Sequence, residues 1–195
     1  MNVLVVTAHP RPESLTGQVA GKIVEGLAAA GHKYEILDLY TADFDPRVFP
    51  VDEPNYSDPT KPYSDETFLE MERIRNHDAI IFVFPVWWHS LPAILKGYID
   101  RIFNYGFAYG PAKLPVEKIR WVALAGESKV SYKKRGYHFV LEHHLNTGIA
   151  SYVGVPDSEV EVIYTSPDET ATGEQARQAH YDRIMREAFL IGERF

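Results

Sequence analysis

The segment from residue 79 to 84, Ala-Ile-Ile-Phe-Val-Phe, is the feature that most restricts how this chain can fold. Every position is apolar, whereas a strand with one face in water would alternate apolar and polar residues. Strands that are apolar throughout are typical of parallel sheets that helices cover on both faces. Pro85 is expected to end the hydrogen-bonded ladder. Pro92 then suits the first turn of a helix. The apolar residues of that helix recur on one face: Leu95, Tyr98, Ile99, Ile102 and Phe103.

Further strands and helices alternate along the chain. Strands are predicted at residues 3–7, 34–39, 78–84, 119–124 and 160–164. Helices are predicted at residues 14–30, 64–77, 92–103 and 137–152, and a last helix follows the capping-box pattern Thr172-Gly173-Glu174-Gln175. This alternation predicts an α/β fold with a doubly wound, five-stranded parallel sheet in the flavodoxin-like order 2-1-3-4-5 and helices on both faces.

Residues 45–63, the proline-rich segment, interrupt this pattern. Five prolines in this stretch argue against regular structure. A loop of this length inside a compact domain is often functional. A chain of 195 residues is long enough for one well-buried domain and too short for two comfortable ones, so residues 1–195 are predicted to form a single domain.

The composition restricts the function classes. The chain has no cysteine, which excludes disulfides and a thiolate nucleophile and fits a reducing compartment, so a cytoplasmic location is expected. No apolar run has the features of a signal peptide or a membrane span, and no membrane insertion is expected. A formal net charge of -7 disfavours nucleic-acid binding, which needs a clustered positive face. Lys129 and Lys133-Lys134-Arg135 are locally basic, which suits an anionic small ligand or a solvated loop.

The loop after the first predicted strand, residues 9–16, lies where nucleotide-binding α/β folds place a phosphate against a helix N-terminus. It contains no glycine, so the Rossmann and Walker patterns are both missing. Hydroxyl groups of Ser14 and Thr16, with positive charge from His9 and Arg11, would then have to hold a phosphate or pyrophosphate. The alternative is that Ser14 is simply a helix N-cap, and the two roles are compatible.

The loop after the apolar strand carries Trp87, Trp88 and His89 at the predicted carboxyl edge of the sheet. Paired aromatic residues can pack against a flat heterocycle while the loop backbone donates hydrogen bonds to its ring atoms, and a flavin meets both demands. The alternative is that the tryptophans fill core space or a subunit interface. His89 by itself is most simply a surface or interface histidine.

Two stretches resemble the NAD(P)H:quinone oxidoreductase family of flavodoxin-like flavoenzymes. They are FPVWWHSLPAILKGYIDRIF with Tyr105-Gly106-Phe107-Ala108-Tyr109, and the opening TAHPRPESLT. The resemblance implies that one set of residues binds the flavin phosphate: His9, Ser14, Leu15 and Thr16. It implies that a second set lines the edge of the isoalloxazine ring, largely through backbone groups: Pro85, Val86, Trp87, Trp88 and His89.

Residues 125–138 also fit a glycine-containing loop of that family without a gap. The resemblance then makes Gly126 a residue that lets the backbone approach the flavin, and makes Tyr132 and His138 catalytic. Hydroxyl and N–H donors would stabilise the charge that develops on the ring, and a histidine can exchange a proton near neutral pH. Glu127 stands where the family often has a second glycine. The alternatives are an exposed histidine at a helix start and a locally packed tyrosine.

The resemblance implies an enzyme that transfers hydride from NAD(P)H to a bound flavin and then to a quinone or another flat acceptor, such as a nitro or azo compound, by a ping-pong mechanism. Phe107 and Tyr109 would join the tryptophans around the acceptor, and a homodimer is expected. The long chain and its proline-rich segment favour FAD over FMN. The alternatives are a flavin-binding electron carrier or regulatory subunit of a partner such as a transporter, and a cofactor-free interaction domain. Zinc-type spacings are missing, so no metal site is expected.

Overall fold

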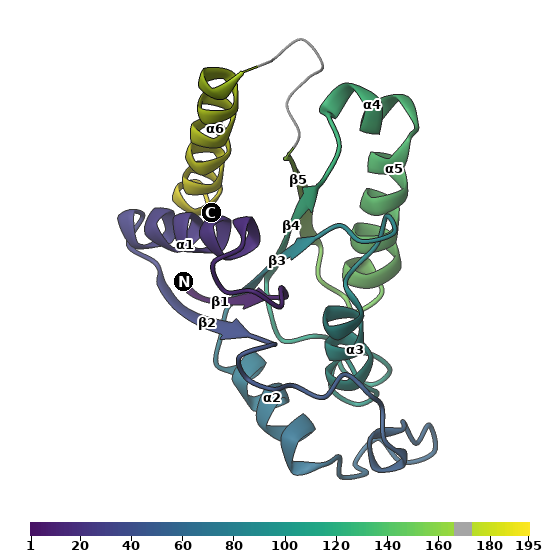
Figure 1. Cartoon of the computed structure of the whole chain (residues 1–195). Coiled ribbons are helices and arrows are strands. Elements are labelled where there is room, and N and C mark those ends of the chain that lie inside the picture. Colours follow the sequence, from purple (N-terminus) through teal and green to yellow (C-terminus); the bar gives the residue numbers. More distant parts are fainter. Residues whose placement is uncertain (166–172) are drawn as a thin grey trace.

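A five-stranded parallel sheet forms the centre of the protein, whose computed structural model describes residues 1–165 and 173–195 (Figure 1). The strands are β1 (Asn2–Thr7), β2 (Lys33–Asp38), β3 (Ala79–Pro85), β4 (Lys118–Ala125) and β5 (Asp157–Tyr164). Their order in the sheet is β2-β1-β3-β4-β5, and all pairs are parallel. The predicted fold class and strand order are therefore confirmed.

Helices cover both faces of this sheet (Figure 1). Their bounds are α1 (Leu15–Ala29), α2 (Asp65–Arg75), α3 (Ala93–Ile102), α4 (Lys129–Lys134), α5 (Tyr137–Glu142) and α6 (Glu174–Glu193). Alternate residues of β3 face opposite layers: Ile81 and Val83 pack with α1 and α6, and Phe82 packs with the layer of α2, α3 and α5. Since six of its seven residues are buried, β3 is the two-sided core strand that its apolar run predicts.

The ladder continues through Pro85, against the expectation that it ends there. Pro85 pairs with Leu124 of β4, and the backbone N–H of Val86 donates to the Leu124 carbonyl at 2.8 Å. Proline lacks only its own N–H group, so the pairing can continue where a neighbouring residue supplies the donor. The strand consequently carries the chain one residue further toward the edge of the sheet.

The segment predicted as one helix, residues 137–152, has two geometries. It begins as α5 and continues as a π-helix, η2 (His143–Ser151). The six-residue α4 was not predicted; it starts after the N-cap Ser128, whose hydroxyl accepts from the backbone of Ser131, and Gly136 with φ 74° separates it from α5. Such short or widened helices leave no full apolar period in the sequence.

Two further differences are small. The proline-rich segment contains a single 3₁₀ turn, η1 (Pro50–Asp52), and otherwise lacks helices and strands as predicted. The predicted capping residue Thr172 lies outside the described residues, and α6 starts at Glu174 after Gly173. The proline-rich segment and the start of the last helix therefore both lie close to where they were predicted.

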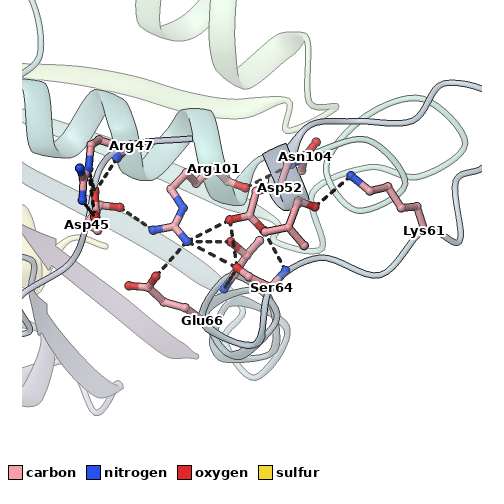
Figure 2. A network of polar contacts seen from close by, with 10 residues as sticks. Asp45, Arg47, Asp52, Lys61, Ser64, Glu66, Arg101 and Asn104 are labelled. Carbon is pink, nitrogen blue, oxygen red and sulfur yellow. Dashed lines mark hydrogen bonds and ion pairs between the residues drawn. The ribbon is translucent and has the colours of Figure 1, made fainter. Parts of the chain in front are cut away.

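A buried arginine anchors the proline-rich segment to α3. Figure 2 shows the Arg101 guanidinium between Asp52 and Glu66, at N–O distances of 3.0 and 2.8 Å. The same group donates to the backbone carbonyl of Asp45 at 2.5 Å. Arg101 and Asp52 are 1% and 0% exposed, so this ion pair is buried. A buried charge needs such partners, because isolated charges are very costly away from water.

The hydrogen bonds around Asp52 extend the anchor to the residues that follow α3. The Asp52 carboxylate accepts from the backbone N–H of Ser64 at 2.8 Å, and its carbonyl accepts from the Asn104 side chain at 2.6 Å. Close by, the Tyr63 hydroxyl donates to the carbonyl of Tyr105 at 2.7 Å. The ends of the proline-rich segment and residues 104–105 are therefore held as one unit.

Helices α1 and α6 cross each other (Figure 1). Gly26 and Gly192 lie where the two helices are in close contact, and alanine at either one is expected to destabilise the fold. A Cβ atom on Gly26 would lie 2.1 Å from the Phe189 carbonyl oxygen, and one on Gly192 would lie 2.0 Å from that of Ile23. We expect each change to lower the free energy of unfolding by about 1–3 kcal/mol, because backbone atoms must move apart. Urea denaturation measures this loss.

The matched control for this crossing is Gly21→Ala, also within α1. A Cβ there meets no atom within 4 Å, and Gly21 is exposed. It should raise stability by about 0.5–1 kcal/mol, as glycine-to-alanine changes do in open helix positions. Equal changes in the free energy of unfolding for Gly21→Ala and Gly26→Ala would show that the close contact of α1 with α6 is not the reason why alanine destabilises the protein at Gly26.

Candidate flavin site

A pocket of about 280 Å³ lies where β1 and β3 end, at the point where the strand order of the sheet reverses. Open α/β sheets bind their ligands at this kind of position. The pocket is lined by His9, Arg11, Ser14, Leu15, Thr16, Pro85, Val86, Trp87, Leu124, Gly126 and Thr165. All predicted cofactor-binding residues except Trp88 and His89 are on its wall. Four stretches of the sequence, 9–16, 85–87, 124–126 and Thr165, thus meet at one site.

The first wall is the loop between β1 and α1. Ser14 caps α1, since its hydroxyl accepts from the Gly17 N–H at 3.2 Å and its carbonyl accepts from the Gln18 N–H at 3.0 Å. The N–H groups of Leu15 and Thr16 come before this first helical bond, as helix-start donors do. A helix N-terminus favours anions, and Arg11 adds charge to the same wall. Ser14 can therefore be a cap and a phosphate neighbour at once.

The second wall is the loop after β3. Trp87 and Ser90 exchange backbone hydrogen bonds of 3.1 and 3.0 Å, which closes a tight turn over Trp88 and His89. The Trp87 ring lies 6.2 Å from the His9 ring, so the loops after β1 and β3 are in contact. Trp88 is 97% exposed and is therefore not a core residue. Its indole and the His89 ring lie outside the pocket wall.

The third wall is at the ends of β4 and β5. Among the residues that the structure describes, none has an atom within 4 Å of a Cβ built on Gly126, so these residues leave open space above it. Thr165 donates to the Ala125 carbonyl from its backbone N–H at 2.9 Å and from its hydroxyl at 3.1 Å. Leu124 and Thr165 line the pocket without having been predicted as binding residues, whereas Arg11 was predicted to supply charge for a phosphate. Thr165 and Leu124 could have been found from the shared edge at which parallel strands end.

Tyr132 lies beside this pocket in a cluster of aromatic rings. It is 2% exposed, and its ring centroid is 5.5 Å from Tyr137, 5.7 Å from Tyr164 and 6.4 Å from His89. It also packs in the small cluster that contacts Val86 of the pocket wall. Within the described residues its hydroxyl has no hydrogen-bond partner. Burial, followed by the charges of nearby acidic groups, raises the pKa of Tyr132 to about 12, so the phenol keeps its proton.

His138 and Glu127 each contact other residues than Tyr132 does. The His138 ring lies 3.9 Å from Phe139, and its Nδ1 is buried without a hydrogen-bond partner in the described part of the chain. No ring contact joins it to Tyr132 among the described residues. The Glu127 carboxylate accepts from Ser131 at 2.5 Å and pairs with Arg135. The side chain that replaces a family glycine is thus bonded to α4.

Two of the predicted acceptor-pocket residues lie elsewhere. Phe107 is buried, with the Arg75 guanidinium 4.8 Å from its ring centroid. Tyr109 lines a separate pocket of about 460 Å³ between α3 and η2. In the described residues, no group of three or more histidines or acids could hold a metal ion, and no helix is long and apolar enough to cross a membrane.

Comparison with known proteins places the chain in a family. The family described as flavodoxin-like fold matches residues 1–186. An uncharacterized NAD(P)H oxidoreductase of Escherichia coli (strain K12), YcaK, is 37% identical over 184 residues, which cover 94% of this chain and 92% of that protein. The solved NAD(P)H:quinone oxidoreductase of Methanothermobacter marburgensis has a TM-score of 0.83 and 28% identity over 97% of this chain and 94% of that one. The chain belongs to the NAD(P)H:quinone oxidoreductase family.

A third relative covers less of the protein. The ribosyldihydronicotinamide dehydrogenase (quinone) of Mus musculus is 34% identical over 122 residues, which cover 55% of this chain and 53% of that protein. Membership in the NAD(P)H:quinone oxidoreductase family confirms the resemblance that the sequence motifs indicate. It also confirms that the protein is an oxidoreductase.

Gly126→Ala is expected to weaken flavin binding without unfolding this member of the quinone oxidoreductase family. The new methyl group would meet no atom of the described residues within 4 Å, so stability should stay close to that of the wild type. If a flavin approaches Gly126, as the resemblance implies, the methyl group would occupy space that the cofactor needs, and a misfit of about 1–3 kcal/mol corresponds to roughly a 10- to 100-fold rise in the flavin Kd. Flavin titration of the cofactor-free protein measures this Kd. An unchanged Kd would place the ring away from Gly126.

Proposed function

We propose that this protein binds a flavin in the pocket at the ends of β1 and β3 and catalyses the two-electron reduction of quinones or similar flat acceptors by NAD(P)H. One observation carries the proposal. The N-terminus of α1, which suits a phosphate, and the space that the described residues leave open above Gly126, which suits a ring, lie on the walls of the same pocket. The donors present are hydroxyl, backbone N–H and guanidinium groups, which fit the phosphate and heterocycle of a flavin.

The roles of the side chains follow from their positions. A bound flavin supplies the ring that accepts hydride from one substrate and releases it to the other. The N–H groups of Leu15 and Thr16, with Arg11, would hold its phosphate, and the backbone of Val86 and Trp87 would border its ring. Tyr132, whose raised pKa keeps its O–H, remains a hydrogen-bond donor throughout the neutral range.

His138 has the proposed role of exchanging a proton in each half-reaction, because an imidazole can both donate and accept a proton. One pocket would serve both substrates in turn, so we expect ping-pong kinetics. Initial rates at several fixed concentrations of acceptor should give parallel double-reciprocal lines. Intersecting lines would show that both substrates bind together and would contradict the proposed mechanism.

Purified protein tests the cofactor directly. A yellow preparation whose absorbance bleaches rapidly on addition of NADH or NADPH supports the proposed function. Mass spectrometry of the released flavin distinguishes FAD, which we propose from the length of the chain and its proline-rich segment, from FMN. A colourless protein that fails to bind either added flavin would refute the proposal.

We further propose that the enzyme acts as a homodimer on a small planar acceptor. The exposed rings of Trp87 and Trp88 beside the pocket support an acceptor that binds by stacking, since stacking selects flatness more than a single chemical identity. Light scattering after gel filtration measures the assembly. Turnover with a quinone, a nitro compound and an azo compound ranks the acceptor classes.

A further inference from the structure

The backbone of the turn over Trp88 and His89 has an unusual conformation for these residues. Their φ angles are 52° and 57°, and among the described residues Asp43 is the only other non-glycine residue with a positive φ. Two-residue turns with both central residues in the left-handed region strongly prefer asparagine and glycine. This chain instead has two large rings there. Strain of this kind persists only where the surroundings hold it, and it occurs often at functional sites.

The His89 ring joins the turn to a neighbouring helix. It stacks on Tyr137 with ring centroids 3.7 Å apart and planes 26° apart. Tyr137 begins α5, and its ring in turn lies 5.5 Å from that of Tyr132 in α4. The stack therefore joins the loop after β3 to the segment that follows β4. These two segments carry the second wall of the pocket and both proposed catalytic residues.

The neighbouring Trp88 is presented to solvent by the same turn. Its side chain is 97% exposed, and no ring contact involves it among the described residues. Burial therefore contributes little to its position, and the direction of its indole depends on the backbone of the turn. A ring held in place before the ligand arrives loses less freedom on binding than a mobile one.

We propose that His89 is a positioning residue: through its stack on Tyr137 it clamps the Trp88–His89 turn against α5, so that the Trp88 indole stands ready to stack on the flat electron acceptor. This rests on the proposed function. The ligand class is a planar aromatic or quinoid molecule, for which an exposed indole is a suitable surface. His89 itself does not touch the acceptor in this proposal.

Two variants of His89 separate positioning from stability. His89→Gly removes the ring while glycine adopts the positive φ without strain, and His89→Phe keeps a flat ring for Tyr137. We expect His89→Gly to raise the KM for a soluble benzoquinone about 3- to 10-fold, the range that corresponds to one aromatic pair. Its melting temperature should fall little, because glycine relieves the backbone strain of the turn. His89→Phe should retain the wild-type KM within about 2-fold.

The exposed aromatic residue Phe68 of α2 provides the control, because Phe68→Ala removes an exposed ring from a helix outside the turn. It should leave both half-reactions unchanged. An unchanged KM in His89→Gly, or the same KM rise in His89→Phe, would overturn the positioning role.

A double-mutant cycle tests the contact without any need for turnover. His89→Gly and Tyr137→Ala, alone and combined, should change thermal stability non-additively, since both remove the same stack. Additive effects would overturn the clamp. If the wild type binds no flavin, the proposed function fails. Non-additive effects in such a protein would show that His89 and Tyr137 are in contact, but the proposed role of this contact in acceptor binding would be overturned.

Discussion

Arg101→Met is expected to lower the free energy of unfolding by about 3–5 kcal/mol, the loss typical of a buried ion pair that is broken on one side. The change removes the ion pairs to Asp52 and Glu66 that are drawn in Figure 2. Asp52, which is fully buried, would keep a charge without its cation. Methionine fills similar volume, so the loss reports the charge rather than a cavity. Urea denaturation at neutral pH measures it.

The control is Arg47→Ala, which breaks a second arginine pair in the same network. The Arg47 side chain is 75% exposed, so water replaces its contact with Asp45 and no measurable loss is expected. A similar loss for Arg101→Met and Arg47→Ala would contradict the distinction between buried and exposed pairs in this network.

The stability that Asp52 contributes should also depend on pH. Burial raises its pKa, but hydrogen bonds from Ser64, Arg101 and Thr67 outweigh this effect and hold the pKa below its usual value. A carboxyl with a lowered pKa stabilises the fold above its unfolded pKa, near about 3.9, and loses that contribution as the pH falls through its folded value. The stability difference between the wild type and Asp52→Asn should therefore shrink below about pH 4. A difference that stays constant on acidification would show that the carboxylate charge is not what matters.

Tyr132→Phe is expected to slow flavin reduction by roughly 100-fold, the usual effect of removing one donor that stabilises developing charge. The change keeps the packing against Tyr137 and Tyr164 and removes only a hydroxyl that has no partner among the described residues. Since a buried polar group without a partner costs about 1–3 kcal/mol, the variant should be as stable as the wild type or more stable. Stopped-flow reduction and urea denaturation measure the two effects.

Measuring both the reduction rate and the stability of Tyr132→Phe distinguishes a catalytic hydroxyl from a structural one. Tyr34→Phe at the exposed edge strand β2 removes a hydroxyl of the same kind and should change neither quantity. A Tyr132→Phe enzyme with a normal reduction rate and raised stability would make Tyr132 a packing residue only. A variant with lower stability would indicate that the hydroxyl has a structural partner.

The fold was predictable because its signals are local. The apolar run of β3 and the 3.6-residue period of α1 and α3 each lie within a few turns of chain, and the alternation of strands and helices leads to the order β2-β1-β3-β4-β5. The prediction of helices was wrong where a helix is too short to show a full apolar period in the sequence. The helix α4 has six residues, and the change from α5 to the π-helix η2 alters the hydrogen bonding without altering the composition.

The sequence by itself determined the sheet and its two helical layers, because periodicity requires no knowledge of distant contacts. The shared edge of parallel strands also indicated the loops after the first and third strands, whereas Gly126 came only from the resemblance to the family. Only the tertiary structure decided that His89 stacks on Tyr137 and that Arg101 is buried with Asp52. These pairs join residues 48 or 49 positions apart (137 - 89 and 101 - 52). The physical reason is that burial and partner choice depend on which chain segments meet after folding, and a ring or a charge has the same local signal in either environment.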